Sequence, residues 1–112
     1  MDSILLSIKK LLGPSADYKQ FDQDLIIHIN SAFMVLHQLG VGPKKSFSIT
    51  GETETWKDFS SDIDNLQLVK SYIYLKVRLI FDPPTNSTVI KAYEDLIKEY
   101  EWRLNVEVDP SN

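Results

Sequence analysis

Apolar side chains recur every three to four residues in four stretches of the 112-residue chain, which is the spacing of an amphipathic helix. The first stretch runs from about Ser3 to Leu12 and ends at the "GPS" that follows. The second starts at Asp22, a residue type suited to an N-cap, and closes at Gly40. The first part of the chain is therefore predicted to form two helices.

The third stretch begins near Asp64 and is apolar on two sides when it is drawn as a helix. One stripe comprises Leu66, Val69, Ile73, Val77 and Ile80, and the other comprises Leu68, Tyr72, Leu75 and Leu79. A helix that is apolar on two sides must be covered on two sides. Two interpretations are open: it is the central helix of a bundle, between the second and fourth helices, or one stripe meets a neighbouring subunit.

Two prolines stop the third helix and make a corner before the fourth. Proline has no N–H and disfavours helical geometry in the residue before it, so the helix must end near Asp82, ahead of Pro83 and Pro84. The next helix, capped by Ser87 or by the Asn86 beside it, begins soon afterwards. A rigid corner of this kind would fix the crossing angle of the two helices.

The fourth helix, from about Ser87 to Asn105, has one apolar face and one tryptophan that lies outside that face. Its apolar face comprises Val89, Tyr93, Leu96, Ile97, Tyr100 and Leu104. Trp102 lies opposite that face, among oppositely charged pairs four residues apart. Either it folds back onto the first helix, or it anchors a partner, as exposed aromatic side chains often do. Residues 106–112 are expected to form a flexible tail.

The middle segment, from Lys44 to Phe59, has a different pattern. Apolar side chains alternate with serines before Gly51, which suits a short β-hairpin with that glycine in the turn. An irregular loop that places Trp56 on the core is the alternative. The predicted fold is therefore a single all-α domain, residues 1–112, built as a small bundle of about four helices with a long middle loop or a short β-hairpin between the second and third.

Composition narrows the classes of function. The chain has no cysteine, which removes disulfides and thiolate chemistry, and neither a signal peptide nor a membrane span is apparent, so we expect a soluble protein. Its 16 acidic and 12 basic residues give a net charge of −4, without the basic stripe that a protein gripping nucleic acid normally shows.

No motif in the chain carries recognisable chemistry. There is no glycine-rich phosphate loop, and His28 and His37 are nine residues apart on one helix, so they point in opposite directions and cannot share a metal ion. The carboxylates of the middle segment, such as Glu54 and Asp58, match no calcium loop and suit helix capping. We expect no catalytic residue, no metal, no cofactor and no enzymatic activity.

Several segments are similar to a known family. The run "VKSYIYLKVRLIFDPP", the helix end "YEWRLNV", the opening "SILLSIKKLLG" and the "TWKDF" ahead of the third helix resemble the head-tail connector proteins of tailed bacteriophages. These are the adaptor or head-completion proteins related to lambda-like and HK97-like neck proteins. The likeness covers nearly the whole chain, and its motifs are structural.

The resemblance implies an all-helical virion protein at the head-tail junction, assembled in the cytoplasm of the bacterial host. Such an adaptor forms a ring of about a dozen identical copies beneath the portal protein. It extends the DNA channel, through which DNA passes without specific binding, and presents a surface to the next head-closure or tail protein. It carries no catalytic motif and has no membrane partner.

Within that interpretation, the surplus apolar and aromatic residues are candidate interface residues: Trp102, Tyr72, Leu75, Leu79 and Trp56. The corner at Asp82, Pro83 and Pro84 would hold each wedge-shaped subunit rigid. The alternative is a small helical DNA-binding or regulatory module with a helix-turn-helix. Two features argue against that alternative: acidic residues outnumber basic ones, and no helix has several basic residues on its exposed face.

Overall fold

A computed structural model describes residues 3–60 and 63–106, and these form a helical domain. The helices are α1 (Ile4–Leu12), α2 (Asp22–Gln38), α3 (Trp56–Phe59), α4 (Ile63–Phe81) and α5 (Ser87–Val106), with short 3₁₀ helices at Pro14–Ala16 and Lys19–Phe21. The described residues contain no β-strand, and the predicted all-α class is confirmed. The predicted tail lies outside the described residues from position 107 onward.

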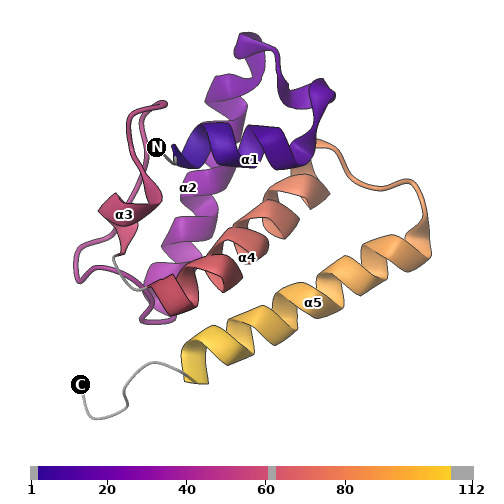
Figure 1. The fold of residues 1–112 in the computed structure, drawn as a ribbon. Coiled ribbons are helices and arrows are strands. Elements are labelled where there is room, and N and C mark those ends of the chain that lie inside the picture. The colour runs from indigo at the N-terminus through magenta and orange to yellow at the C-terminus, as the bar shows by residue number, and fades with distance from the viewer. Residues whose placement is uncertain (1–2, 61–62, 107–112) are drawn as a thin grey trace.

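Helix α4 runs through the middle of the domain (Figure 1). It packs against α2 and α1 on one side and against α5 on the other. Helix α5 returns beside α4 in the opposite direction after the proline corner (Figure 1). The central-helix interpretation of the two apolar stripes is therefore confirmed, because α4 lies between α2 and α5 of the same chain. Ile80, at the end of the first stripe, is the exception and is 57% exposed.

The core lies mainly between α1, α2 and α4, and the middle segment closes one end of it. An aromatic cluster joins these parts, since the Phe33 ring on α2 lies 5.0 Å from the rings of both Phe47 and Phe59, measured between centroids. Edge-to-face and tilted ring pairs of this kind stabilise a core beyond the area that they bury. The middle segment is thus bound to the domain by side-chain packing.

The middle segment forms no hairpin, and the alternative of an irregular loop with Trp56 on the core is correct. A side chain replaces the missing strand partner: the Asn30 amide accepts a bond from the Ile49 N–H (2.7 Å) and donates one to the Ile49 carbonyl (2.9 Å). Near α1 there is a single isolated bridge, between Ser3 and Thr55. Because Asn30 satisfies the backbone of Ile49, no second strand is required there.

The helix ends agree with the sequence except at α2. Ser3 caps α1, and Asn86, the second of the two candidates, caps α5 by accepting bonds from the backbone N–H groups of Thr88 and Val89. Asp22 was predicted to cap α2, but it is the first residue of the helix and the cap position belongs to Phe21. The Asp22 carboxylate instead meets the Lys9 ammonium at 2.7 Å.

Arg78 makes hydrogen bonds at the C-terminal end of α4, just ahead of the two prolines in the sequence. Helix α4 ends at Phe81, as predicted. The Arg78 Nε donates to the carbonyl of Asp82, and a second guanidinium nitrogen donates to the Tyr74 hydroxyl at 3.0 Å. A cation that binds a carbonyl at the C-terminal end of a helix also offsets the negative end of the helix dipole.

Candidate interaction surfaces

The five candidate interface residues divide between the core and the surface. Trp56 and Tyr72 are 2% and 0% exposed, Leu75 is also buried, and Leu79 is half-buried. Trp102 is 67% exposed. The first four side chains therefore pack within the chain itself, and Trp102 alone among the five has a large exposed aromatic surface.

Trp56 owes its burial to local capping and to one long-range bond. It is the first residue of α3, whose N-cap Thr55 exchanges two bonds with Asp58 in a capping box. The indole N–H donates to the Ser7 hydroxyl at 3.1 Å, and the Lys70 ammonium lies 5.5 Å from the ring centroid. These contacts anchor the middle segment to α1 and α4.

Tyr72 joins α4 to α5. Its hydroxyl donates a 2.7 Å hydrogen bond to a carboxylate oxygen of Glu101. Burial, together with the hydrogen bond to Glu101 and the charge of that carboxylate, raises the pKa of the Tyr72 hydroxyl well above its ordinary range. The hydroxyl therefore stays protonated and remains a donor.

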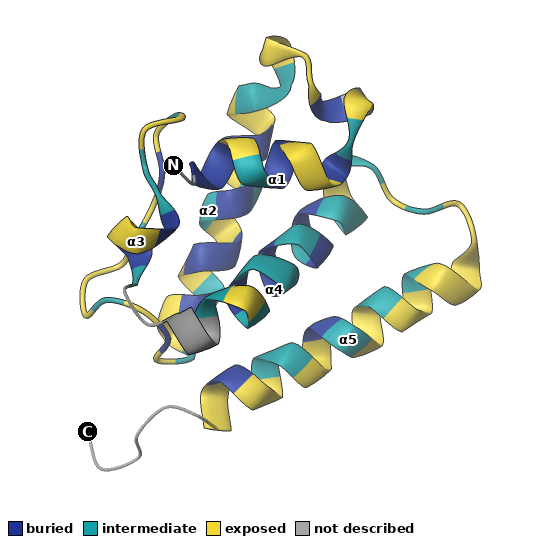
Figure 2. Cartoon of the chain, viewed as in Figure 1, coloured by how far each residue is buried: buried dark blue, intermediate teal, exposed yellow. Residues whose placement is uncertain are grey.

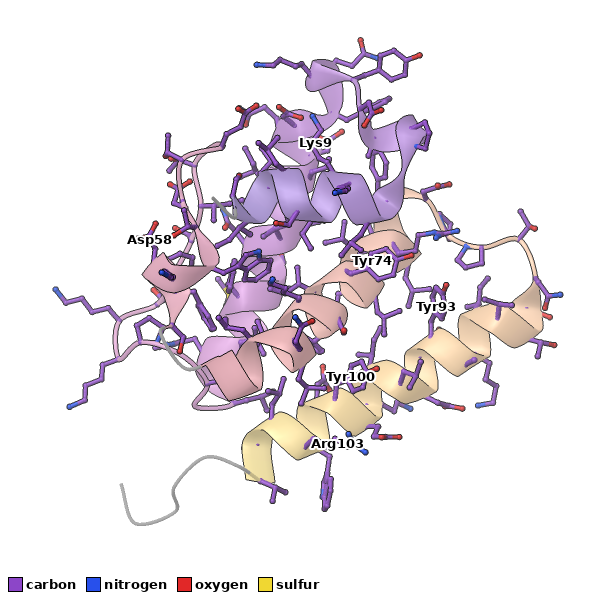
Figure 3. The ribbon with its side chains drawn as sticks, in the orientation of Figure 1. Lys9, Asp58, Tyr74, Tyr93, Tyr100 and Arg103 are labelled. Atoms are coloured by element: carbon purple, nitrogen blue, oxygen red, sulfur yellow. The ribbon has the colours of Figure 1, made fainter. Side chains whose placement is uncertain are left out.

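Trp102 lies on the outer side of α5. Figure 2 shows α5 buried only along the side that faces α4, where Ile97 and Leu104 are its buried residues. In Figure 3, Tyr93 and Tyr100 lie on that inner side and Arg103 on the opposite one. Val106, one turn beyond Trp102, is also exposed, at 57%. Of the two alternatives for Trp102, folding back onto the first helix is therefore wrong, because the side chain is exposed and α4 separates α1 from α5 (Figure 1).

An open groove of about 620 Å³ lies between α1 and α4. Its apolar wall comprises Leu6, Leu11 and Tyr74, and two cations, Lys10 and Lys70, line it without any carboxylate. Leu6 and Leu11 are 46% and 53% exposed. Leu11 thus forms part of an exposed apolar wall at the end of α1.

A second open groove, of about 480 Å³, lies between α4 and α5. Leu79, Ile80 and Ile97 form its apolar part, and Ile80 is largely exposed. Two lysines and two glutamates surround them. Because both signs of charge are present in equal number, this groove favours neither an acidic nor a basic partner.

Two carboxylates of the middle segment, Glu54 and Asp58, act as caps. Glu54 accepts bonds from the Thr50 N–H (2.9 Å), the Thr50 hydroxyl (2.8 Å) and the Gly51 N–H. Slight desolvation raises the pKa of Glu54, but these hydrogen bonds outweigh it and hold the pKa below the ordinary 4.5. Glu54 thus closes the turn that we had considered for a hairpin.

Two further findings concern other classes of site. Within residues 3–60 and 63–106, no three histidine or carboxylate side chains gather closely enough to hold a metal ion. Over the same ranges, no helix has both the length and the apolarity required to cross a bilayer.

A family model for phage connector proteins matches residues 4–111, which is almost the whole chain. The chain belongs to the phage connector protein family. The resemblance seen in the sequence is thereby confirmed, and membership supports a structural role at the junction of phage head and tail. The connector has no significant match among curated proteins or among solved structures.

Proposed function

We propose that this connector assembles as a ring of about a dozen identical copies beneath the portal vertex, where it joins the capsid to the tail. The observation that carries the proposal is the family match over residues 4–111. Its direct partners are further copies of itself, the portal protein, and the next head-closure or tail protein. The assembly takes place in the host cytoplasm and remains in the neck of the virion.

The build of the subunit suits this role. Closing a ring of many copies requires each copy to hold the same shape, because angular errors add around the ring. The Pro83–Pro84 corner and the bond from Arg78 to the Asp82 carbonyl fix α5 relative to α4 at one end. At the other end of α5, the Asn105 amide donates to the Leu39 carbonyl at 3.2 Å. The longest helix of the domain is therefore held at both ends.

The net negative charge of the chain is suited to the wall of a channel through which DNA passes. Each copy carries a net charge of −4, so a closed ring multiplies that charge around its bore. Like-charge repulsion then lets DNA pass without adhering to the wall. The exposed Lys44 and Lys45 of the middle segment should accordingly lie away from the bore.

Light scattering on a sizing column tests the proposal. The mass of the connector is measured alone and after mixing with the portal protein of the same phage. A large closed assembly in either sample is expected, and the two samples together show whether the ring needs the portal. A monomer that leaves the portal unchanged would contradict the proposal.

The same preparation can test the second candidate function, a DNA-binding or regulatory module. A gel shift with duplex DNA is measured at several salt concentrations. The connector proposal predicts no retained complex at physiological salt, because a chain with a net negative charge offers few basic side chains to contact the DNA phosphates. A complex that weakens steeply as salt rises would favour the DNA-binding module.

A further inference from the structure

We propose that the end of α5 in one copy docks in the α1–α4 groove of a second copy, giving a head-to-tail interface. The docking element comprises Trp102 and Val106, and the receiving groove comprises Leu6, Leu11, Tyr74, Lys10 and Lys70. This inference rests on the proposed function, since it names the surfaces through which the copies of that ring meet.

The two surfaces lie on opposite sides of the subunit. Helix α4 separates α1 from α5 (Figure 1), so the docking element of a copy cannot reach its own groove. A ring of identical subunits requires this arrangement: each copy must present two different, complementary patches, one to each neighbour. A single self-complementary patch would give a closed dimer instead.

Both surfaces expose apolar side chains that the subunit itself does not cover. On the docking element, Trp102 and Val106 are one turn apart on the same side of α5, and each is more than half exposed. In the groove, Leu6 and Leu11 flank an open volume of about 620 Å³. A tryptophan seated in an apolar recess is a common centre of binding energy in protein interfaces.

The charges of the two surfaces are complementary. The groove is lined by two lysines and no carboxylate. Within α5, Glu99 pairs with Arg103, and Glu101 accepts the hydrogen bond of Tyr72 on the side that faces α4. The sequence directly after Val106 adds two acidic residues, Glu107 and Asp109, and no basic one. An apolar pair followed in the sequence by two carboxylates therefore matches a basic groove with an apolar wall. Lys10, which is exposed, can also lie over the Trp102 ring in the assembled pair.

Cysteine cross-linking tests the interface directly, because the natural chain has no cysteine to interfere. Two single variants, Gln67→Cys in the groove and Val106→Cys on the docking element, are mixed under conditions where assembly occurs and then oxidised. A mixed disulfide dimer is expected from this pair. The matched control replaces Gln67→Cys with Met34→Cys, which is exposed on α2, and should give no mixed dimer above background.

A second variant pair tests the energetic role of the tryptophan. Trp102→Ala and Met34→Ala each remove one exposed apolar side chain, so both should keep the helical circular dichroism of the parent. Trp102→Ala is expected to raise the concentration required for assembly about tenfold or more, whereas Met34→Ala leaves it unchanged.

The results separate this inference from the proposed function. An assembly that still forms normally with Trp102→Ala, or that cross-links through α2 but not through the Gln67 and Val106 positions, overturns the interface and leaves the connector role standing. If no assembly forms with or without the portal, both the interface and the ring are wrong.

Discussion

The Tyr72 hydroxyl donates a 2.7 Å hydrogen bond to the Glu101 carboxylate, and this bond joins the central helix to the last one. Helix α5 has only two buried residues among those described, so it is held by a narrow apolar strip and a few polar links. Tyr72 is fully buried, which makes its link to Glu101 more sensitive to mutation than the ion pairs on the outside of α5.

Removing the Tyr72 hydroxyl should therefore destabilise the domain. Tyr72→Phe keeps the ring in the core but leaves the carboxylate without its donor. We expect the free energy of unfolding to fall by about 1–2 kcal/mol, since a hydrogen bond to a charged group is lost. Urea unfolding followed by circular dichroism measures the change.

The matched comparison is a double-mutant cycle with Glu101→Gln. If the two residues stabilise the domain through one bond, the double variant should be less destabilised than the sum of the single variants. Effects that simply add would show that the 2.7 Å contact does not couple α4 to α5 energetically.

The Lys9–Asp22 pair should be the most costly ion pair to break among those described. Its atoms are 2.7 Å apart, and both side chains are largely shielded from water. Lys9→Met leaves a shielded carboxylate without its cation, so a loss of about 2–3 kcal/mol is expected. Thermal or urea unfolding gives the value.

Lys91→Met is the control for that measurement, because Lys91 pairs with Asp95 at 3.7 Å on the exposed side of α5. Its loss should cost no more than about 0.5 kcal/mol. Equal losses of unfolding free energy at the two positions would contradict the expectation that the shielded pair stabilises the domain more than the exposed one.

The turn closed by Glu54 should make stability depend on pH. The folded-state pKa of Glu54 lies below 4.5, the ordinary value expected in the unfolded chain. Its contribution is therefore fully present well above pH 4.5 and is lost as the pH falls through the folded-state pKa. Glu54→Gln should be less stable than the parent at pH 7, and the difference should shrink below pH 4.5.

Glu52→Gln provides the comparison, because Glu52 is exposed and its nearest cation, on Lys19, is 3.8 Å away. That variant should follow the parent closely across the same pH range. A Glu54→Gln difference that stays constant from pH 7 to pH 3 would show that the carboxylate charge does not hold the turn.

The proline corner should matter more for assembly than for folding. Replacing Pro83 and Pro84 with alanine loosens the link between α4 and α5 and costs about 1–2 kcal/mol of stability through the unfolded state. The fraction of protein in the assembled form, measured by light scattering, should fall severalfold. Pro43→Ala, in the segment that follows α2, should leave assembly unchanged. Normal assembly by the double variant would contradict the rigid-wedge account.

The long helices and the proline corner could be predicted because their signals are local. The period of apolar residues predicted α4 and α5, and Pro83 and Pro84 predicted where α4 ends. Asp22 was assigned the wrong role because its partner, Lys9, is thirteen positions earlier and meets it only once α1 packs beside α2. A capping pattern contains no information about such a tertiary contact.

The candidate interface was predicted only in part. Trp102 stood out because an aromatic side chain among charges has no local explanation, and it is exposed. Trp56 and Tyr72 also stood out, but Trp56 packs against α1 and α2, and α5 covers Tyr72. The α1–α4 groove could not be predicted, because it depends on the position of α1 across α4, which leaves Leu11 outside the core.

The most direct test of the connector role is electron microscopy of particles made by the phage when this gene carries an early stop codon. Our account predicts heads and tails that accumulate separately, and tailed infectious particles that return when the intact protein is supplied from a plasmid. Normal numbers of tailed, infectious particles without the protein would contradict it.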